Sequence, residues 1–90
     1  MTIKYQIFLI SDSTGETLDR IFLALQSQFS NFDYDKKEFV FIRTEQQINK
    51  IISECKEKKS AIILYTIVDG ELAKFLESET KKLNIPCFGV

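Results

Sequence analysis

Residues 3–29 read IKYQIFLISDSTGETLDRIFLALQSQF and place an apolar run directly before an apolar pattern of helical period. The run Ile3–Ile10 is rich in Ile, Phe, Leu and Tyr, which predicts a strand covered on both faces. The apolar positions that follow are spaced three, one, three and four residues apart, at Leu18, Ile21, Phe22, Leu25 and Phe29. This spacing predicts a helix from Leu18 onward, and hence a strand and helix unit of the kind that builds parallel sheets.

The same alternation continues toward the middle of the chain. Residues Ser30–Lys37 are polar and without period, which indicates a solvated connection that Phe32 and Tyr34 pin down, and Glu38–Arg43 predicts a second strand. Thr44 and Gln47 have the spacing of a capping box. The helix that they begin has an apolar face at Ile48, Ile51, Ile52 and Cys55 and ends in the charged run 56–59.

A third strand is predicted over Ala61–Ile67, followed by a helix with Asp69 as its N-cap. The inward residues of that helix are predicted to be Leu72, Ala73, Leu76 and Leu83. Pro86 favours extended geometry at the preceding residue, so a fourth strand is predicted to start around Ile85–Cys87. The fold class is therefore α/β, a three-layer Rossmann-like or flavodoxin-like parallel sheet.

Right-handed crossovers limit the order of these strands. The order 2-1-3-4 is favoured because the connection from Val68 to Ile85 is almost all helix and suits adjacent strands, and the order 3-2-1-4 stays open. Either order leaves part of one sheet face without a helix. We expect residues 1–90 to form one α/β domain, the N-terminal part of a longer protein, whose bare face packs on downstream residues or forms a homo-oligomer.

Composition excludes several classes of function. Twelve Lys and Arg residues against thirteen Asp and Glu residues give a net charge of −1, so no nucleic-acid partner is expected. No apolar run approaches the ~18 residues of a membrane helix and no signal peptide is evident, so we expect no membrane partner and a cytoplasmic protein. Without any histidine, His-dependent catalysis is excluded, and with Cys55 and Cys87 read as core residues no metal site is predicted.

The segment with chemical potential follows the first predicted strand and reads Ser11-Asp12-Ser13-Thr14-Gly15-Glu16-Thr17, with four hydroxyls and one of three glycines. Open parallel sheets bind ligands at the carboxyl ends of their strands, and a helix N-terminus attracts anions. We therefore predict a phosphate or ligand loop made by Ser11, Asp12, Ser13, Thr14, Gly15 and Thr17, with Arg43, at the end of the second strand, as a guanidinium partner.

A purely structural interpretation of this loop stays open. Ser13 and Glu16 have the spacing of a capping box, which needs no ligand, and the carboxylate of Glu16 would repel a bound dianion. An arginine at the end of a strand, such as Arg43, is more often a solvated surface residue, and Asp69 is better explained as a helix cap than as a base. Neither G-x-G-x-x-G nor G-x-x-x-x-G-K-[ST] occurs in the chain.

Two resemblances follow from these residues. Ser13-Thr14-Gly15-Glu16-Thr17 is similar to the phosphate loop of flavodoxins, although Glu16 stands where a neutral residue is usual and no flavin-stacking aromatic loop follows Ala61–Ile67. Over its whole length, and most clearly at Ile10–Leu18, Ala61–Asp69 and Ile85–Val90, the chain resembles the opening of the pyruvate, phosphate dikinase and phosphoenolpyruvate synthetase regulatory proteins.

The second resemblance implies a serine/threonine kinase and phosphorylase. Such an enzyme phosphorylates a threonine of its target dikinase or synthetase with ADP as donor, and removes the phosphate with inorganic phosphate to release pyrophosphate. The P-loop of the family lies downstream of the region covered here, so we expect no catalytic residue and no cofactor within residues 1–90, and ADP or ATP and phosphate in the longer protein. This region alone is expected to be inactive, and the alternative is a stand-alone flavodoxin-like or receiver-like module that binds phosphate or flavin.

Overall fold

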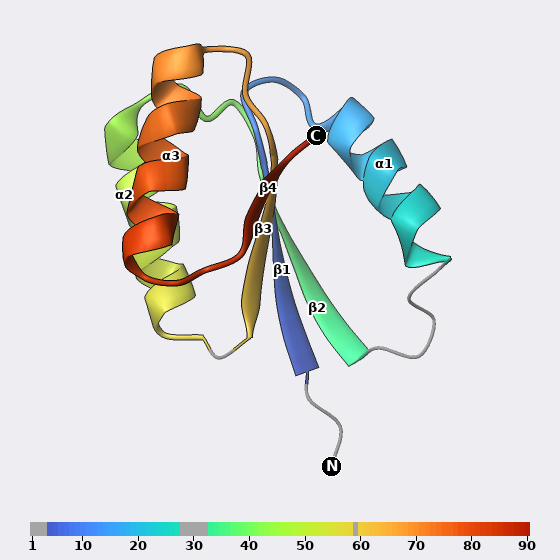
Figure 1. The fold of residues 1–90 in the computed structure, drawn as a ribbon. Helices are drawn as coiled ribbons and strands as arrows, with labels where there is room; N and C mark the ends of the chain where they lie inside the picture. Colours follow the sequence, from blue (N-terminus) through green and yellow to red (C-terminus); the bar gives the residue numbers. More distant parts are fainter. Residues whose placement is uncertain (1–3, 28–32, 59) are drawn as a thin grey trace.

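The computed structural model describes residues 4–27, 33–58 and 60–90, in which strands and helices alternate strictly (Figure 1). The strands are β1 (Lys4–Ser11), β2 (Asp33–Phe39), β3 (Ala61–Thr66) and β4 (Cys87–Gly89), and the helices are α1 (Glu16–Gln26), α2 (Glu45–Lys56) and α3 (Gly70–Lys82). All neighbouring strands are parallel, in the order β2-β1-β3-β4. The predicted α/β class and the favoured order 2-1-3-4 are both confirmed.

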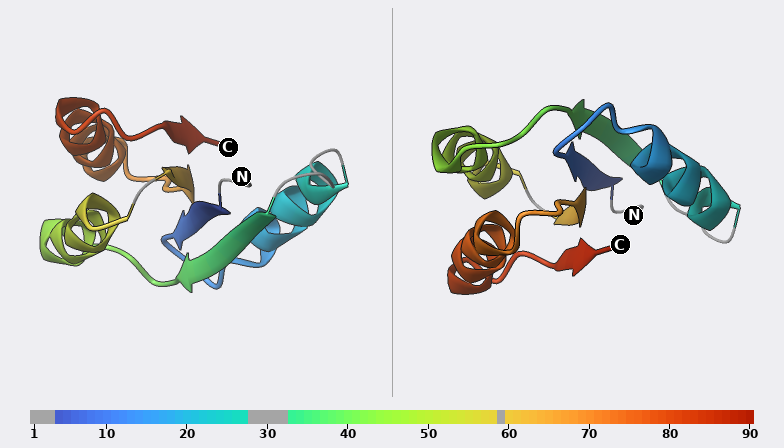
Figure 2. Two further views of the ribbon diagram at one scale, coloured as in Figure 1. Left: turned by 90° about the horizontal axis from the view of Figure 1, so that it is seen from below. Right: turned by 90° about the horizontal axis from the view of Figure 1, so that it is seen from above.

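The two faces of the sheet are covered unequally. Helices α2 and α3 lie together on one face, and α1 lies alone on the other (Figures 1 and 2). The main core forms beneath α2 and α3, where Ile10 and Ile63 of the sheet and Ile48 and Leu76 of the helices are fully buried. The core beneath α1 is much smaller, since its buried members are Leu9, Leu18 and Phe22.

The predicted beginnings of α2 and α3 are confirmed. The backbone N–H of Gln47 donates to the Thr44 hydroxyl at 3.2 Å and the Gln47 side chain accepts from the Thr44 backbone, so the capping box is complete. The Asp69 carboxylate accepts from the backbone N–H groups of Glu71 and Leu72. The predicted apolar face of α2 is buried at each of its positions, Ile48, Ile51, Ile52 and Cys55.

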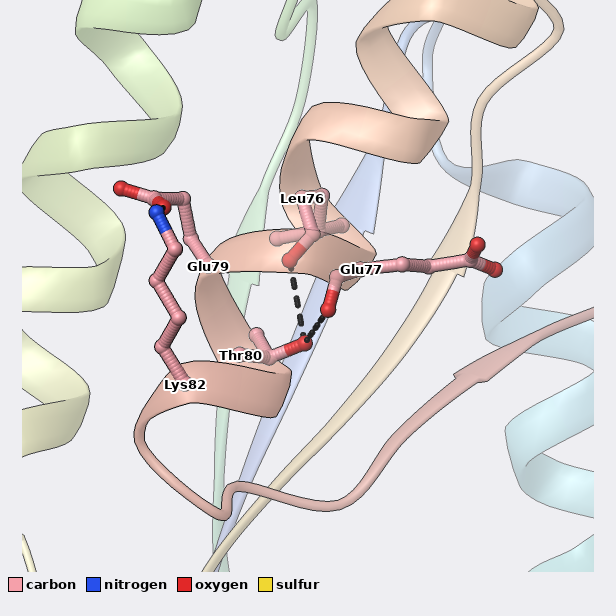
Figure 3. A network of polar contacts seen from close by, with 5 residues as sticks. All are labelled: Leu76, Glu77, Glu79, Thr80 and Lys82. Atoms are coloured by element: carbon pink, nitrogen blue, oxygen red, sulfur yellow. Dashed lines mark hydrogen bonds and ion pairs between the residues drawn. The ribbon is translucent and has the colours of Figure 1, made fainter.

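Within α3, Leu72 and Leu76 are buried and Ala73 is half-buried, as predicted, but the prediction for Leu83 is wrong. Leu83 follows the last helical residue and is 38% exposed, because the chain turns there toward β4. Thr80 organises this turn (Figure 3): its buried hydroxyl donates to the carbonyls of Leu76 and Glu77, and its own carbonyl accepts from the Ile85 N–H at 2.9 Å.

The prediction for the second strand is wrong. Residues 33–37, assigned to a solvated connection, belong to β2, where Asp33–Phe39 pair in register with Lys4–Ile10 of β1. Because β2 is an edge strand with mostly exposed side chains, its sequence is charged and lacks the apolar pattern of a buried strand. The apolar residues that suggested a strand beyond Phe39 lie in a loop, where Phe41 has a left-handed φ of 54° and Ile42 is buried in the main core.

Other boundaries differ by a few residues. Helix α1 starts at Glu16, two residues before the predicted start, β3 ends at Thr66 instead of Ile67, and β4 is Cys87–Gly89, two residues later than predicted. Tyr34 lies within β2, and its ring packs edge-to-face with that of Phe22, with the two ring centres 5.5 Å apart. The predicted roles of Ile3, Phe29, Ser30 and Phe32 fall outside the described residues. None of the described helices combines the length and apolar character that crossing a membrane requires.

Candidate functional site

The loops that follow β1, β2 and β3 meet at the carboxyl end of the sheet. The N–H groups of Phe41 and Ile42, after β2, donate to the carbonyls of Ser13 and Ser11 at 3.0 Å each. On the other side, the N–H of Asp12 donates to the carbonyl of Thr66 at 3.2 Å. The loop after β1 is therefore held between its two neighbours by main-chain hydrogen bonds, at the place where parallel sheets bind ligands.

Ser11 holds the start of this loop through its buried hydroxyl. It is only 2% exposed, and its hydroxyl accepts from the N–H of Ser13 at 3.1 Å. The hydroxyls of Ser13 and Thr66 lie 3.4 Å from the same oxygen. Of the predicted ligand residues, Ser11 therefore faces the interior and shapes the loop, and it is not open to a ligand.

Asp12 ties the loop to both neighbours. One carboxylate oxygen accepts from the Val68 N–H at 2.8 Å, beyond β3, and the carbonyl of Asp12 accepts from Nε of Arg43 at 3.1 Å. The Asp12 carboxylate is thus engaged in positioning backbone, which explains an acidic residue beside a predicted anion site.

Arg43 does not end β2 as predicted, since it lies four residues beyond the last residue of that strand. The structure nevertheless brings it to the loop after β1 through its contact with Asp12. The backbone N–H of Arg43 donates to the side-chain oxygen of Gln47 at 2.7 Å, and its guanidinium lies 5.6 Å from the centre of the Phe41 ring. Among the described residues only the Asp12 carbonyl accepts from the guanidinium, so its terminal nitrogens are available for an anion.

The predicted capping box of Ser13 and Glu16 is wrong. The N-cap of α1 is Gly15, with φ 85° and ψ 1°, and no side-chain hydrogen bond caps the helix. Ser13 lies two residues before the N-cap, where its N–H donates to Ser11 and its carbonyl accepts from Phe41. A Cβ built on Gly15 would lie 3.1 Å from Cγ1 of Val40, so both the left-handed backbone and the close loop favour glycine.

Hydroxyl residues lie on both sides of the uncapped start of α1 in the sequence. Ser13, Thr14 and Thr17 are all exposed. The first N–H groups of a helix need acceptors, and here no side chain supplies one. Hydroxyls, N–H groups and the Arg43 guanidinium are all donors that suit a phosphate oxygen.

Two acidic residues in the first turn of α1, Glu16 and Asp19, place negative charge at the N-terminus of this helix. Glu16 is exposed in the first turn, as the sequence indicated. Asp19, also in the first turn, is paired with Lys36 of β2 at 3.1 Å, and this hydrogen bond lowers the pKa of Asp19. Because the Lys36 ammonium compensates Asp19, Glu16 is the one first-turn carboxylate without a described cationic partner.

The sequence missed the contribution of the neighbouring loops. The hydroxyl of Thr66 donates to that of Ser11 and its carbonyl accepts from the N–H of Asp12, while the N–H of Phe41 donates to the carbonyl of Ser13 on the other side of the loop. No sequence pattern predicts that Phe41 is exposed and has a left-handed φ. A hydroxyl at the end of β3 was visible, but its meeting with Ser11 depends on the strand order.

The two cysteines lie away from this loop. Cys55 is buried as predicted, whereas Cys87 is only half-buried, and both are free thiols. Burial raises the pKa of Cys55 to about 12 and that of Cys87 to about 11. Both thiols are therefore protonated near neutral pH and suit a structural role.

We predict that iodoacetamide at pH 8 modifies both thiols much more slowly in the native chain than in urea, because the thiolate is the reactive species. Raising the pH toward 11 should accelerate labelling of Cys87 before that of Cys55. Peptide mass mapping of each cysteine over time measures the two rates. Rapid labelling of native Cys55 at pH 8 would contradict its burial.

The chain is thus an open parallel α/β protein with a tied, hydroxyl-rich loop at the carboxyl end of its first strand, where proteins of this class bind their ligands. Residues 7–90 match the sequence model of the family described as kinase/pyrophosphorylase. The chain belongs to this kinase/pyrophosphorylase family.

Individual relatives agree with this assignment. The chain is 59% identical, over all of its 90 residues, to a protein of Pelagibacter ubique (strain HTCC1062), of which it covers 33%. It is 44% identical over 80 residues, 89% of its length, to a protein of Alkaliphilus oremlandii (strain OhILAs), of which it covers 28%. Both are named as pyruvate, phosphate dikinase regulatory proteins, and the chain spans about a third of the length of these relatives.

Proposed function

We propose that this chain is part of a bifunctional enzyme that regulates pyruvate, phosphate dikinase by phosphorylating and dephosphorylating one of its threonines. The match of residues 7–90 to the kinase/pyrophosphorylase family is the observation that carries this proposal. The names of the relatives support the dikinase as the target. Phosphoenolpyruvate synthetase is the alternative target of the same chemistry.

The proposed reactions balance as two phosphoryl transfers. In one direction the β-phosphoryl group of ADP passes to the threonine oxygen, AMP leaves and the hydroxyl proton is released. In the other, an oxygen of inorganic phosphate attacks the phosphorus of phosphothreonine, the bond to the threonine oxygen breaks, and the products are threonine and pyrophosphate. We assign no catalytic residue within residues 1–90, because the chain has no P-loop sequence to hold a nucleotide.

For this part of the enzyme we propose a phosphate-contacting role at the loop 11–17. The support is that the exposed residues Ser13, Thr14 and Thr17 lie next to the uncapped N-terminus of α1 in the sequence, and that the Arg43 guanidinium contacts the same loop. The group bound would be inorganic phosphate or a phosphoryl group of the substrate. Ser11, Asp12 and Gly15 would hold the loop in shape without touching the ligand.

The enzymatic proposal is tested by joining this chain to the remaining two thirds of the Pelagibacter ubique relative. We expect the joined protein to phosphorylate purified pyruvate, phosphate dikinase with ADP, and to release pyrophosphate from the phosphorylated dikinase when phosphate is added. Radiolabel transfer and a pyrophosphate assay measure the two directions. A joined protein that folds but acts on the synthetase alone would reassign the target, and one that transfers no phosphoryl group to either would refute the proposal.

The loop is tested in the same protein with the double change Ser13→Ala and Thr14→Ala. A hydrogen bond to a charged group contributes ~1.5–3 kcal/mol, so the KM for phosphate should rise about tenfold or more. Stability should change little, because neither hydroxyl caps α1 and the Ser13 hydroxyl has only a long contact of 3.4 Å with that of Ser11. The control is Ser53→Ala with Ser78→Ala, which removes two exposed hydroxyls from α2 and α3 and should leave the KM unaltered. Equal KM values for the two double variants would leave the loop without a phosphate role.

A further inference from the structure

The face of the sheet that carries α1 holds an open apolar groove of about 450 Å³. Its floor is made by side chains of β1, β3 and β4, including Ile62, Leu64 and Phe88, and α1 forms one wall with Phe22 and Leu25. Figure 2 shows that α1 lies beside β2 and β1, while β4 has no helix on this side. We call this feature the α1-side groove.

The sequence of β3 shows that this face is suited to being covered. Residues 61, 63 and 65 are buried by α2 and α3, and the alternate residues Ile62, Leu64 and Thr66 are only half-buried. A strand that is apolar on both faces is typical of a parallel sheet with helices on both sides. Phe88 and Val90 extend the same surface and are 56% and 54% exposed. Contiguous exposed apolar surface of this kind marks an interaction site.

We propose that the α1-side groove binds one apolar helix, supplied by the part of the longer protein that follows the position of Val90. About two thirds of the length of the Pelagibacter ubique relative lies outside the match, so ample chain exists in such proteins. Val90 itself lines the groove, and its N–H donates to the Tyr65 carbonyl at 3.0 Å, which continues the pairing of β4 with β3. Residues beyond this position would therefore start at the groove.

Handedness indicates which helix this is. The crossover from β3 to β4 moves away from β1 and places α3 on the α2 face. Another right-handed crossover in the same direction would place its helix on that face again. The α1-side groove would therefore be covered only by a helix that comes after a further strand. A strand, its crossover and a second helix need roughly 40 residues, well within the length of the relatives.

A second copy of the chain is a poorer occupant. A groove needs a convex apolar partner, and the apolar sides of α2 and α3 are already buried at Ile48, Ile51, Leu72 and Leu76. On the outer side of α1 only Leu23 is a large exposed apolar residue. The groove has no charged residue in its lining, so the helix that fills it would present an uncharged apolar stripe.

The proposal is tested with Phe88→Lys and the matched control Leu23→Lys, whose native side chains are 56% and 55% exposed. In the 90-residue chain both changes should leave the Tm nearly unaltered. In the chain joined to the remainder of the Pelagibacter ubique relative, Phe88→Lys should lower the Tm by about 5 °C or more, because it would bury an unpaired ammonium, whereas Leu23→Lys should not. Equal Tm values for the two joined variants would overturn the proposal.

A second measurement, dye binding, requires no substitution. The apolar dye ANS should bind to the wild-type 90-residue chain and should lose that site in the joined protein. Dye binding that persists unchanged in the joined protein would contradict an intramolecular helix. Sedimentation of the 90-residue chain as a dimer that Phe88→Lys dissociates, with a joined protein unaffected by the change, would assign the groove to a second copy instead. These readouts do not depend on enzymatic activity, so they are independent of the proposed function.

Discussion

Replacing Ile63 with alanine is expected to lower the free energy of unfolding by about 2–5 kcal/mol, the largest effect of any single change considered for this chain. Ile63 lies in the central strand β3, is fully buried, and packs in the core beneath α2 and α3. Removing its side-chain atoms would leave a cavity in this core. Since small domains are stable by ~5–15 kcal/mol, urea denaturation should show a much earlier midpoint.

The neighbouring residue provides the matched control. Ile62 is the same residue type in the same strand, but it points to the α1-side groove and is half-buried. Ile62→Ala should cost about 1 kcal/mol or less in the 90-residue chain, because little packing is lost. Equal losses for Ile62→Ala and Ile63→Ala would contradict the unequal covering of the two faces.

Gly15→Ala is expected to lower the free energy of unfolding by about 1–2 kcal/mol, the usual cost of a left-handed conformation for a residue with a Cβ. Gly15 has φ 85°, and the new methyl group would press against Val40 at 3.1 Å. The strain would act on the loop that presents Ser13 and Thr14, so phosphate affinity should fall together with stability. Thermal unfolding and a phosphate titration of the same sample measure both effects.

Gly70→Ala separates this conformational effect from the removal of a glycine in general. Gly70 opens α3, has no positive φ, and a Cβ there would meet no atom within 4 Å. Alanine should be neutral or slightly stabilising at this helical position. A loss of stability at Gly70 equal to that at Gly15 would show that the left-handed turn is not what makes Gly15 necessary.

The parts of the fold that sequence alone predicted are those with local determinants. Helices α2 and α3 have their caps, Thr44 with Gln47 and Asp69, within a few residues of the apolar positions that they bury. The buried strand β3 is apolar on both faces and could hardly be anything else. In contrast, β2 is stabilised by pairing with β1, and its exposed, charged side chains resemble those of a loop.

The same distinction between local and long-range determinants applies to the candidate site. Its location was predictable, because a hydroxyl-rich segment between a strand and a helix places it at the carboxyl end of the sheet. The roles of its residues could not be predicted. The buried hydroxyl of Ser11 accepts a hydrogen bond from the N–H of Ser13, and Gly15, not Ser13, is the N-cap of α1. The approach of Arg43 depends on a loop whose course follows from the position of β2.

Residues 7–90 belong to the kinase/pyrophosphorylase family, and the loop 11–17 is the part of them for which we propose a phosphate contact. Linking the two requires that the loop 11–17 takes up a phosphate group. Three features of the loop would favour phosphate binding: the tied backbone, the uncapped start of α1 and the guanidinium of Arg43 at its side. The exposed carboxylate of Glu16 opposes phosphate binding, and solvent screens its charge.

The most direct test is a titration of the isotopically labelled 90-residue chain with inorganic phosphate, followed by proton–nitrogen correlation NMR. We expect the largest shifts at the backbone N–H groups of residues 16–18, in the first turn of α1, and at Nε of Arg43, and we expect Ser13→Ala with Thr14→Ala to reduce them. A folded chain whose spectrum does not respond to phosphate, or responds only at residues remote from the start of α1, would show that the loop 11–17 does not bind phosphate.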